Sequence, residues 1–365
     1  MNERQQKERS VRELMDEHGL DALLLRRISS FAWYTGGAAS YVNTATDFGA
    51  ASLLLTPQSN YLLTNNIEAT RLKKEEKLPE QGFQLVAPFW YEGGDPVAEL
   101  TRGLQLGSDS SYPGATDLSA EIARLRARLT PEEGARFRQL GQLCAEAMNG
   151  AIRQVRPGQS EYEIAARLAQ ETLARGVLPI VNLIATDQRI FDFRHPLPTD
   201  KKLERYAMLV LCGRKWGLVC SITRLVHFGP LPDELRRKQE ACARVDATFI
   251  AGTRPGARVA DVFLSGVAAY DENGYPDEWR LHHQGGSAGY EPREHVATFE
   301  SEETIYEGQA FAWNPSITGV KLEDTILVSA QGQGNEILTA IQGWPMIEAE
   351  VLGQTIPRPA ILEVD

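Results

Sequence analysis

The sequence RPGQSEYEIAARLAQETLARG, residues 156–176, is repeated in outline by RPGARVADVFLSGVAAYDENG, residues 254–274. In each copy, Arg-Pro-Gly lies between two stretches with helical periodicity. A block rich in strand-forming residues follows each copy, over 181–229 and 282–330. A Pro-Gly turn alone is common after a helix, but the matching flanks favour a duplication. We therefore predict two helix-helix-strand units related by an approximate two-fold axis, with the two Arg-Pro-Gly turns in equivalent positions.

The repeat follows a boundary that the sequence marks near residue 130. Thr130, Pro131 and Glu133 have the spacing of a capping box at a helix N-terminus. Upstream of them, alternating strand and helix signals predict a smaller α/β domain with a mixed sheet. We expect an N-terminal domain over 1–129 and a larger domain over 130–365, and hence an α/β (α+β) protein with two domains, as a length of 365 residues allows.

The N-terminal domain shows five local signals. Residues 1–20 predict an amphipathic helix, and 68–76 predict another. DALLLRR (21–27) and FAWYTGG (31–37) are interpreted as strand segments because they are short and apolar. ASLLLTPQSNYLLT (51–64) predicts a hairpin, since Pro-Gln-Ser-Asn separates its two apolar runs.

The composition excludes several classes of protein. A net charge of −11 and an isoelectric point near 5.2 disfavour a nucleic-acid partner. No apolar run reaches the ~18 residues of a membrane span, and the charged start lacks the core of a signal peptide. The four cysteines form no CxxC pair, which is typical of reduced thiols. We therefore expect a cytoplasmic protein without disulfides and without a membrane partner.

The second half resembles the pita-bread family of Xaa-Pro peptidases, methionine aminopeptidases and creatinases. The N-terminal stretch TNNIEATRL (64–72) is similar to the smaller domain of the creatinase type. In this family, a cleft between the two repeat units holds two metal ions bridged by two aspartates, one histidine and two glutamates. Relatives with the N-terminal domain commonly pair, so the resemblance implies a homodimer. The stretches that carry the resemblance are Ile222-Thr223-Arg224, HHQGGSAGY (282–290), NPSITGVKLEDT (314–325) and RHPLPTDKK (194–202).

Most of the ligand positions that the resemblance implies hold residues that cannot replace a carboxylate. His283 and Glu323 keep the residue types of the family, in the positions of the histidine and the second glutamate. Two adjacent hard cations need several anionic oxygens, so we expect no metal pair and no other cofactor. The three departures are Ser221 for the second aspartate, Asn314 for the first glutamate, and Leu211 or Cys212, in a shortened hairpin, for the first aspartate.

Creatinase indicates how such a site could still act, because it hydrolyses a C–N bond with a histidine as acid and base and without metal. His195 resembles the substrate-site histidine of the family, and Thr223 stands where creatinase has a further glutamate, which disfavours creatine as the substrate. We predict a metal-independent hydrolase of a small amide, amidine or proline-containing compound. The catalytic residues would be His195, His283 and Glu323, and the substrate-binding residues Ser221, Asn314 and Cys212.

Other interpretations stay open at this point. The chain could be an inactive pseudopeptidase that binds a small molecule or short peptide, or a metal-dependent Xaa-Pro dipeptidase or aminopeptidase whose ligands lie elsewhere. A cysteine could act as a nucleophile beside His283, or bind one zinc ion together with His283 and Glu323. Buried structural roles for the cysteines and for the His282-His283 pair are the plain alternatives. Because they occupy the ligand positions that the resemblance implies, we predict that a set of residues distant in sequence converges around one cleft: Leu211 or Cys212, Ser221, His283, Asn314 and Glu323.

Overall fold

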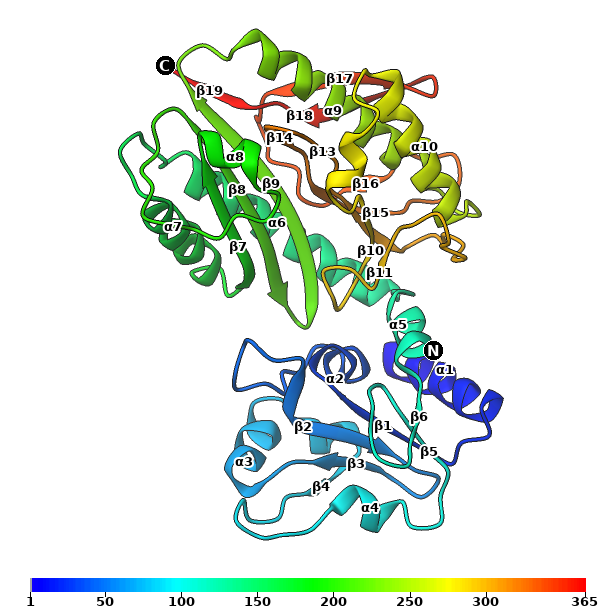
Figure 1. The fold of residues 1–365 in the computed structure, drawn as a ribbon. Helices are drawn as coiled ribbons and strands as arrows, with labels where there is room; N and C mark the ends of the chain where they lie inside the picture. The colour runs from blue at the N-terminus through cyan, green and yellow to red at the C-terminus, as the bar shows by residue number, and fades with distance from the viewer. Residues whose placement is uncertain (1) are drawn as a thin grey trace. The chain divides into compact units, whose positions relative to one another are not determined.

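The computed structural model describes residues 2–365, which divide into two compact units (Figure 1). The first unit comprises the chain up to Ala127 together with Trp216–Leu218. The second comprises Arg128–Lys215 and Val219–Asp365. None of the helices within residues 2–365 has both the length and the apolar character needed to cross a membrane.

A mixed sheet forms the centre of the first unit, with the strand order β4-β3-β2-β1-β5-β6. β1 pairs antiparallel with β2 and parallel with β5, and the predicted hairpin is present, with Leu55 opposite Asn60. Buried leucines of β1 and β2 face its helices. The elements are α1 (Glu3–Glu17), β1 (Ala22–Arg27), α2 (Ile28–Thr35), β2 (Phe48–Leu55), β3 (Asn60–Leu63), α3 (Asn66–Lys74), η1 (Leu78–Gln81), β4 (Phe83–Val86), α4 (Pro96–Leu100), β5 (Leu106–Ser108), β6 (Thr116–Asp117) and α5 (Ser119–Arg126).

One strand expected from the sequence is a helix. The first five residues of FAWYTGG belong to α2, which ends at Thr35 and is capped by Gly36, a residue with a positive φ of 74°. All eight residues of α2 are buried. A helix that is buried on every side needs no polar face, so its apolar run has no helical period and cannot be told from a strand by pattern alone. The strand prediction for 31–37 was therefore wrong.

The second unit contains two larger sheets and two small two-stranded ones, β13-β14 and β17-β18 (Figure 1). α6 and α7 pack against the four-stranded sheet, whereas α9 contacts the five-stranded sheet and α10 packs beside α9. α6 begins with the predicted capping box of Thr130 and Glu133. One sheet has the order β19-β9-β8-β7 and the other β11-β10-β12-β15-β16. The elements of the first half are α6 (Pro131–Ile152), α7 (Glu161–Leu173), β7 (Leu178–Thr186), α8 (Gln188–Asp192), β8 (Tyr206–Lys215) and β9 (Leu218–Phe228). Those that follow are α9 (Asp233–Gly252), α10 (Val259–Glu272), η2 (Glu278–Leu281), β10 (Gly285–Ala288), β11 (His295–Val296), β12 (Ala310–Trp313), β13 (Ser316–Ile317), β14 (Val320–Lys321), β15 (Asp324–Leu327), β16 (Glu336–Ile337), β17 (Met346–Val351), β18 (Gln354–Pro359) and β19 (Leu362–Val364).

The two Arg-Pro-Gly turns have the same hydrogen bonds. The N–H of Gly158 donates to Leu203 O at 2.8 Å, and the N–H of Gly256 donates to Ile305 O at 2.9 Å. Two residues further on, isolated bridges join 160 to 202 and 258 to 304. Each turn therefore attaches the start of a helix, α7 or α10, to the segment that precedes a strand, β8 or β12. This equivalence supports the duplication inferred from the sequence.

Alanine at either turn glycine is expected to cost a similar amount of stability. Gly158 and Gly256 have φ values of +89° and +84°, and a Cβ would meet nothing within 4 Å at either position. The cost is then that of a left-handed backbone alone, about 1 kcal/mol for Gly158→Ala and for Gly256→Ala. Urea unfolding measures it, with Gly334→Ala, at an open site without a left-handed φ, as the near-neutral control. A cost at one turn only would contradict their equivalence.

Four charged side chains form a chain of ion pairs in the core of the second unit. Arg224 Nη2 contacts Asp324 Oδ1 at 2.7 Å, and Arg358 contacts both Asp324 Oδ2 and Asp246 Oδ2 at 2.6 Å. All four are at most 3% exposed. Burial raises the pKa of Asp246 to about 6, against the lowering effect of Arg358. These pairs join β9, β15, β18 and α9 on the side of the strands that faces away from the site described next.

Candidate active site

Two facing strand segments place five polar side chains on one surface. The N–H of Ser221 donates to Thr325 Oγ1 at 2.8 Å, and the hydroxyl of Thr325 donates back to Ser221 O at 3.0 Å. The hydroxyl of Thr223 donates to Glu323 Oε2 at 2.7 Å. Because side chains alternate along a strand, Lys321, Glu323 and Thr325 share this face, while Asp324 faces the buried ion pairs. The sequence left open which face Glu323 occupies, and these contacts assign it to the site.

Glu323 is paired with two cations. Lys321 Nζ lies 3.1 Å from Glu323 Oε2, and Arg293 Nη2 lies 3.0 Å from Glu323 Oε1. All three side chains are at most 9% exposed. Although burial acts to raise the pKa of Glu323, Lys321 and Arg293 lower it to about 2. The carboxyl group of Glu323 is therefore ionised, and both of its oxygens already have partners within the protein.

Arg293 connects Glu323 to Ser221 and Cys212, at the positions that the family resemblance assigns to aspartates. Its Nη1 donates to Ser221 Oγ at 3.4 Å, and Ser221 Oγ lies 3.3 Å from Cys212 Sγ. Leu211 precedes Cys212 on β8, so its side chain points to the opposite face. Burial raises the pKa of Cys212 to about 11, which keeps its thiol protonated near neutral pH. A neutral thiol is a poor nucleophile, so the geometry favours Cys212 as part of the wall of the site.

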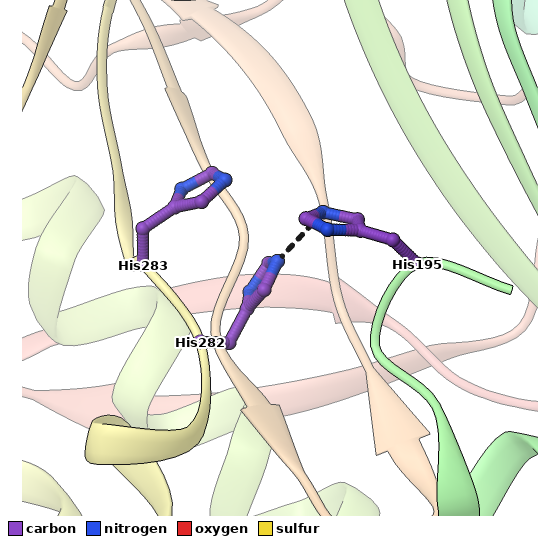
Figure 2. A group of neighbouring side chains, drawn as sticks. All are labelled: His195, His282 and His283. Carbon is purple, nitrogen blue, oxygen red and sulfur yellow. Dashed lines mark hydrogen bonds between the residues drawn. The ribbon is translucent and has the colours of Figure 1, made fainter.

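Three histidines form the second half of the site (Figure 2). His195 lies in the loop after α8, whereas His282 and His283 lie between η2 and β10. The Nε2 atoms of His195 and His282 are 3.0 Å apart, and the rings of His282 and His283 are stacked with centroids 4.4 Å apart. One nitrogen from each ring lies within 4.8 Å of the others. The cluster is thus assembled from segments that are 87 residues apart in the chain.

Neighbouring contacts hold these loops in place. Arg194 Nη2 donates to Glu278 Oε2 and Thr318 Oγ1, both at 2.9 Å, which anchors the loop of His195. Gln284 Nε2 donates to His282 O at 2.6 Å, and its Oε1 accepts from the hydroxyl of Tyr270 at 2.7 Å. Both loops are therefore fixed by side chains that lie next to the histidines in sequence.

The histidines share the electrostatic field of the Glu323 cluster. Burial and then Lys321 lower the pKa of His195, and the same causes lower the pKa of His282 to about 2. Burial, Arg293 and Lys321 lower the pKa of His283 to about 4. Glu323 acts against each of these shifts. All three rings are consequently neutral imidazoles at neutral pH.

The glycine pair after His283 allows neighbouring strands to approach closely. Gly285 and Gly286 have φ values of +110° and +154°, and a Cβ on either would collide with backbone of β12 or of the segment at β11. Asn314 continues this contact, because its N–H donates to Gln284 O at 3.0 Å. Its Oδ1 is buried and has no hydrogen-bond partner among residues 2–365. An acceptor is therefore available beside the histidine loop.

The sequence-predicted site residues thus form two groups within one unit. Cys212, Ser221 and Glu323 are connected through Arg293, and His195 and His283 are grouped with His282. Sequence reasoning missed Arg293 and Lys321. Lys321 could have been found, because it lies two residues before Glu323 and so on the same strand face. Arg293 gives no such local signal, since it is 30 residues away in a turn.

Comparison with known proteins adds the family context. The sequence profile described as "Metallopeptidase family M24" matches residues 135–330, and that of the "Creatinase/Prolidase N-terminal domain" matches residues 9–107. The chain is 23% identical over 355 residues to a Xaa-Pro dipeptidase of Pyrococcus horikoshii, a match that covers 91% of this chain and 96% of that protein.

Solved structures show the same fold. The crystal structure of the prolidase from Pyrococcus horikoshii OT3 aligns with a TM-score of 0.78 at 20% identity, over 92% of this chain and 99% of that one. A Xaa-Pro dipeptidase from Bacillus anthracis aligns with a TM-score of 0.79 at 20% identity, over 99% and 100% of the two chains. Both domains of this chain therefore have counterparts in these structures.

Proposed function

The chain belongs to metallopeptidase family M24, and from this premise we propose that it hydrolyses a C–N bond in a small amide without a pair of catalytic metal ions. The observation that carries the proposal is the pairing of Glu323 with Lys321 and Arg293. Membership of a peptidase family, and similarity to Xaa-Pro dipeptidases over nearly the whole chain, support hydrolysis of an amide bond.

The residues present do not fit a pair of divalent cations. Such a pair brings about four positive charges together, and bridging carboxylates must offset their repulsion. Of the positions that the family resemblance assigns to carboxylates, Glu323 alone holds one, and two protein cations already neutralise it. Ser221, Asn314 and Cys212 fill the others with neutral groups. Lys321 and Arg293 would also repel an incoming ion, so charge and ligand count both oppose this centre.

The same residues can perform hydrolysis by acid and base catalysis. The neutral imidazole of His195 takes a proton from water as the water oxygen attacks the amide carbon. Lys321 and Arg293 stabilise the negative charge that develops on the carbonyl oxygen. When the C–N bond breaks, protonated His195 returns its proton to the leaving nitrogen. Asn314 Oδ1, buried and unpartnered among the described residues, can accept a hydrogen bond from an N–H of the substrate, which is the amide N–H in an N-acyl amino acid and the terminal ammonium in an Xaa-Pro dipeptide.

The charge of the site selects for a substrate with an anionic group. Two cations against one carboxylate leave one positive charge among Arg293, Lys321 and Glu323, and the three histidines are neutral. A carboxylate on the substrate would offset this charge, whereas a cationic amidine or guanidinium would be repelled. Glu323 is also not free to bind a guanidinium. The proposed substrates are therefore small amides that bear a carboxylate, including N-acyl amino acids and Xaa-Pro dipeptides.

Crystals soaked in excess Mn²⁺ are expected to contain no pair of ions at Glu323. The physical reason is the lack of bridging carboxylates and the repulsion by Lys321 and Arg293. Anomalous scattering at the manganese edge measures the occupancy. Two well-occupied ions about 3.5 Å apart would contradict the proposal and favour a metal-dependent Xaa-Pro dipeptidase instead.

Hydrolysis itself is tested with chelator-treated protein and matched pairs of substrates. Each pair consists of an N-acyl amino acid or Xaa-Pro dipeptide and the same compound with its carboxylate converted to a neutral amide. We expect turnover that persists in chelator and a higher kcat/KM for each carboxylate form. Binding of these compounds without turnover would favour a pseudopeptidase, and preference for the neutral forms would refute the assigned substrate class.

A further inference from the structure

We propose that His195, His282 and His283 bind one divalent late transition-metal ion through their ring nitrogens. The inference goes beyond the hydrolase proposal. The site shares His283 with the positions that the family resemblance assigns to the metal pair, but none of its ligands is a carboxylate. Because His195 is one of the ligands, a bound ion would block acid and base catalysis by that ring. Figure 2 shows the three rings pointing toward a common space from two separate loops. Within the part of the chain that the structure describes, these three side chains form the sole group of histidine, cysteine and acidic side chains with metal-site spacing.

The nitrogen positions suit a metal ion with right-angled bonds. Histidine nitrogens bind such ions at about 2.0–2.1 Å. At that bond length, the 3.0 Å between the Nε2 atoms of His195 and His282 corresponds to an angle of roughly 90° at the metal. This is the angle between neighbouring ligands in tetragonal complexes of Ni²⁺ and Cu²⁺, and a tetrahedral Zn²⁺ would need a separation of about 3.3 Å. His283 offers a third nitrogen within 4.8 Å. Two nitrogens on one ion lie at most about 4.2 Å apart at that bond length, so the His283 ring would move inward on binding.

The rings are also in the right chemical state and are accessible. A metal-binding imidazole must be neutral, and burial together with Lys321 or Arg293 keeps these three rings unprotonated at neutral pH. His195 and His283 are exposed, so an ion can enter from solvent, and His282 is 9% exposed at the base of the cluster. Without metal, the Nε2 atoms of His195 and His282 share one proton across 3.0 Å. Binding of the ion through both Nε2 atoms would move that proton to Nδ1 of its own ring, so each imidazole would stay neutral.

The neighbouring cations set the affinity and the selectivity. Lys321 and Arg293 lower the pKa values of the histidines, and the same positive field weakens binding of a doubly charged ion. Three neutral nitrogens offer no anionic oxygen, so Mg²⁺ and other hard cations gain little there. Ions near the top of the affinity series for imidazole, Cu²⁺ and Ni²⁺, are those that the site would hold.

Calorimetric titration of tag-free protein with Ni²⁺ tests the inference directly. We expect one ion per chain and no binding of Mg²⁺. His195→Gln, His282→Gln and His283→Gln should each weaken Ni²⁺ binding by at least about tenfold, and His18→Gln, an exposed histidine of the first unit, should leave it unchanged. Anomalous scattering at the nickel edge should place the ion among the three rings. Absence of binding, or affinity that is unaffected by all three variants, would overturn the proposal.

Lys321→Met separates this site from simple surface binding of nickel. The change removes a positive charge, so Ni²⁺ should bind several-fold more tightly. The same variant should hydrolyse carboxylate-bearing amides more slowly, because it loses a group that stabilises the carbonyl oxygen. The titrations use protein without substrate, so they succeed or fail independently of the hydrolase proposal. Unchanged or weaker Ni²⁺ binding by Lys321→Met would contradict the location of the site.

Discussion

Replacement of His195 by glutamine is expected to lower kcat/KM for the preferred carboxylate-bearing amide by about 10²–10⁴-fold. The substitution keeps a polar side chain of similar size but removes the group that accepts the proton of water and returns it to the leaving nitrogen. His195 lies in an exposed loop that Arg194 anchors through Glu278 and Thr318. The fold should therefore tolerate the change, and the loss should appear in kcat rather than in stability.

His18→Gln is the matched control for this experiment. His18 is an exposed residue at the end of α1 in the first unit, and the same substitution there should change kcat/KM by less than twofold. Both variants should unfold at the parent's urea midpoint. If His195→Gln keeps the activity of the parent, the assignment of His195 as acid and base is wrong.

Replacement of Arg358 by alanine is expected to lower the free energy of unfolding of the second unit by about 3–5 kcal/mol. Arg358 is fully buried and contacts both Asp246 and Asp324 at 2.6 Å. Arg224 would still neutralise Asp324, but Asp246 would lose its ion-pair partner. Most of the lost stability is expected to come from the Asp246 carboxylate, which would stay buried without a counter-charge. Urea unfolding followed by tryptophan fluorescence measures the loss.

Arg236→Ala provides the comparison at the surface. Arg236 pairs with Glu363 at 3.3 Å, and the two side chains are 46% and 43% exposed. Water screens such a pair, so its loss should cost at most about 1 kcal/mol. Asp246→Asn combined with Arg358→Ala should recover part of the stability lost in the single variant, because it removes the uncompensated charge. Equal costs for Arg358→Ala and Arg236→Ala would contradict the role assigned to the buried pairs.

Local signals in the sequence predicted the elements that are stabilised by contacts between residues close together in the chain. The capping box at Thr130 and the hairpin at 51–64 are present because side chains bond their own neighbouring backbone or turn. The duplicated Arg-Pro-Gly turns likewise depend on one glycine with positive φ in each copy. The helix over Ile28–Thr35 was missed because its burial on all sides depends on the rest of the first unit.

The site could be predicted only in part for the same physical reason. Residue types predicted neutral side chains at three positions that the family resemblance assigns to carboxylates, but they gave no sign that Arg293 reaches Glu323 from a distant turn. The approach of His195 to His282 likewise results from two loops that come together only in the folded unit. Contacts between segments that are distant in sequence leave no periodic signal, so the structure was needed to find them.

The contact of Glu323 with Lys321 and Arg293 has a consequence for engineering, because it would make a two-metal site difficult to build by single substitutions. In a Ser221→Asp variant, the new carboxylate would lie beside Arg293, which already reaches Ser221 Oγ at 3.4 Å, and would form an ion pair rather than bind metal. Loss of Lys321 or Arg293 first would leave Glu323 buried with less compensation, at a cost in stability. The effect of each substitution therefore depends on the others, so these residues would have to be changed together.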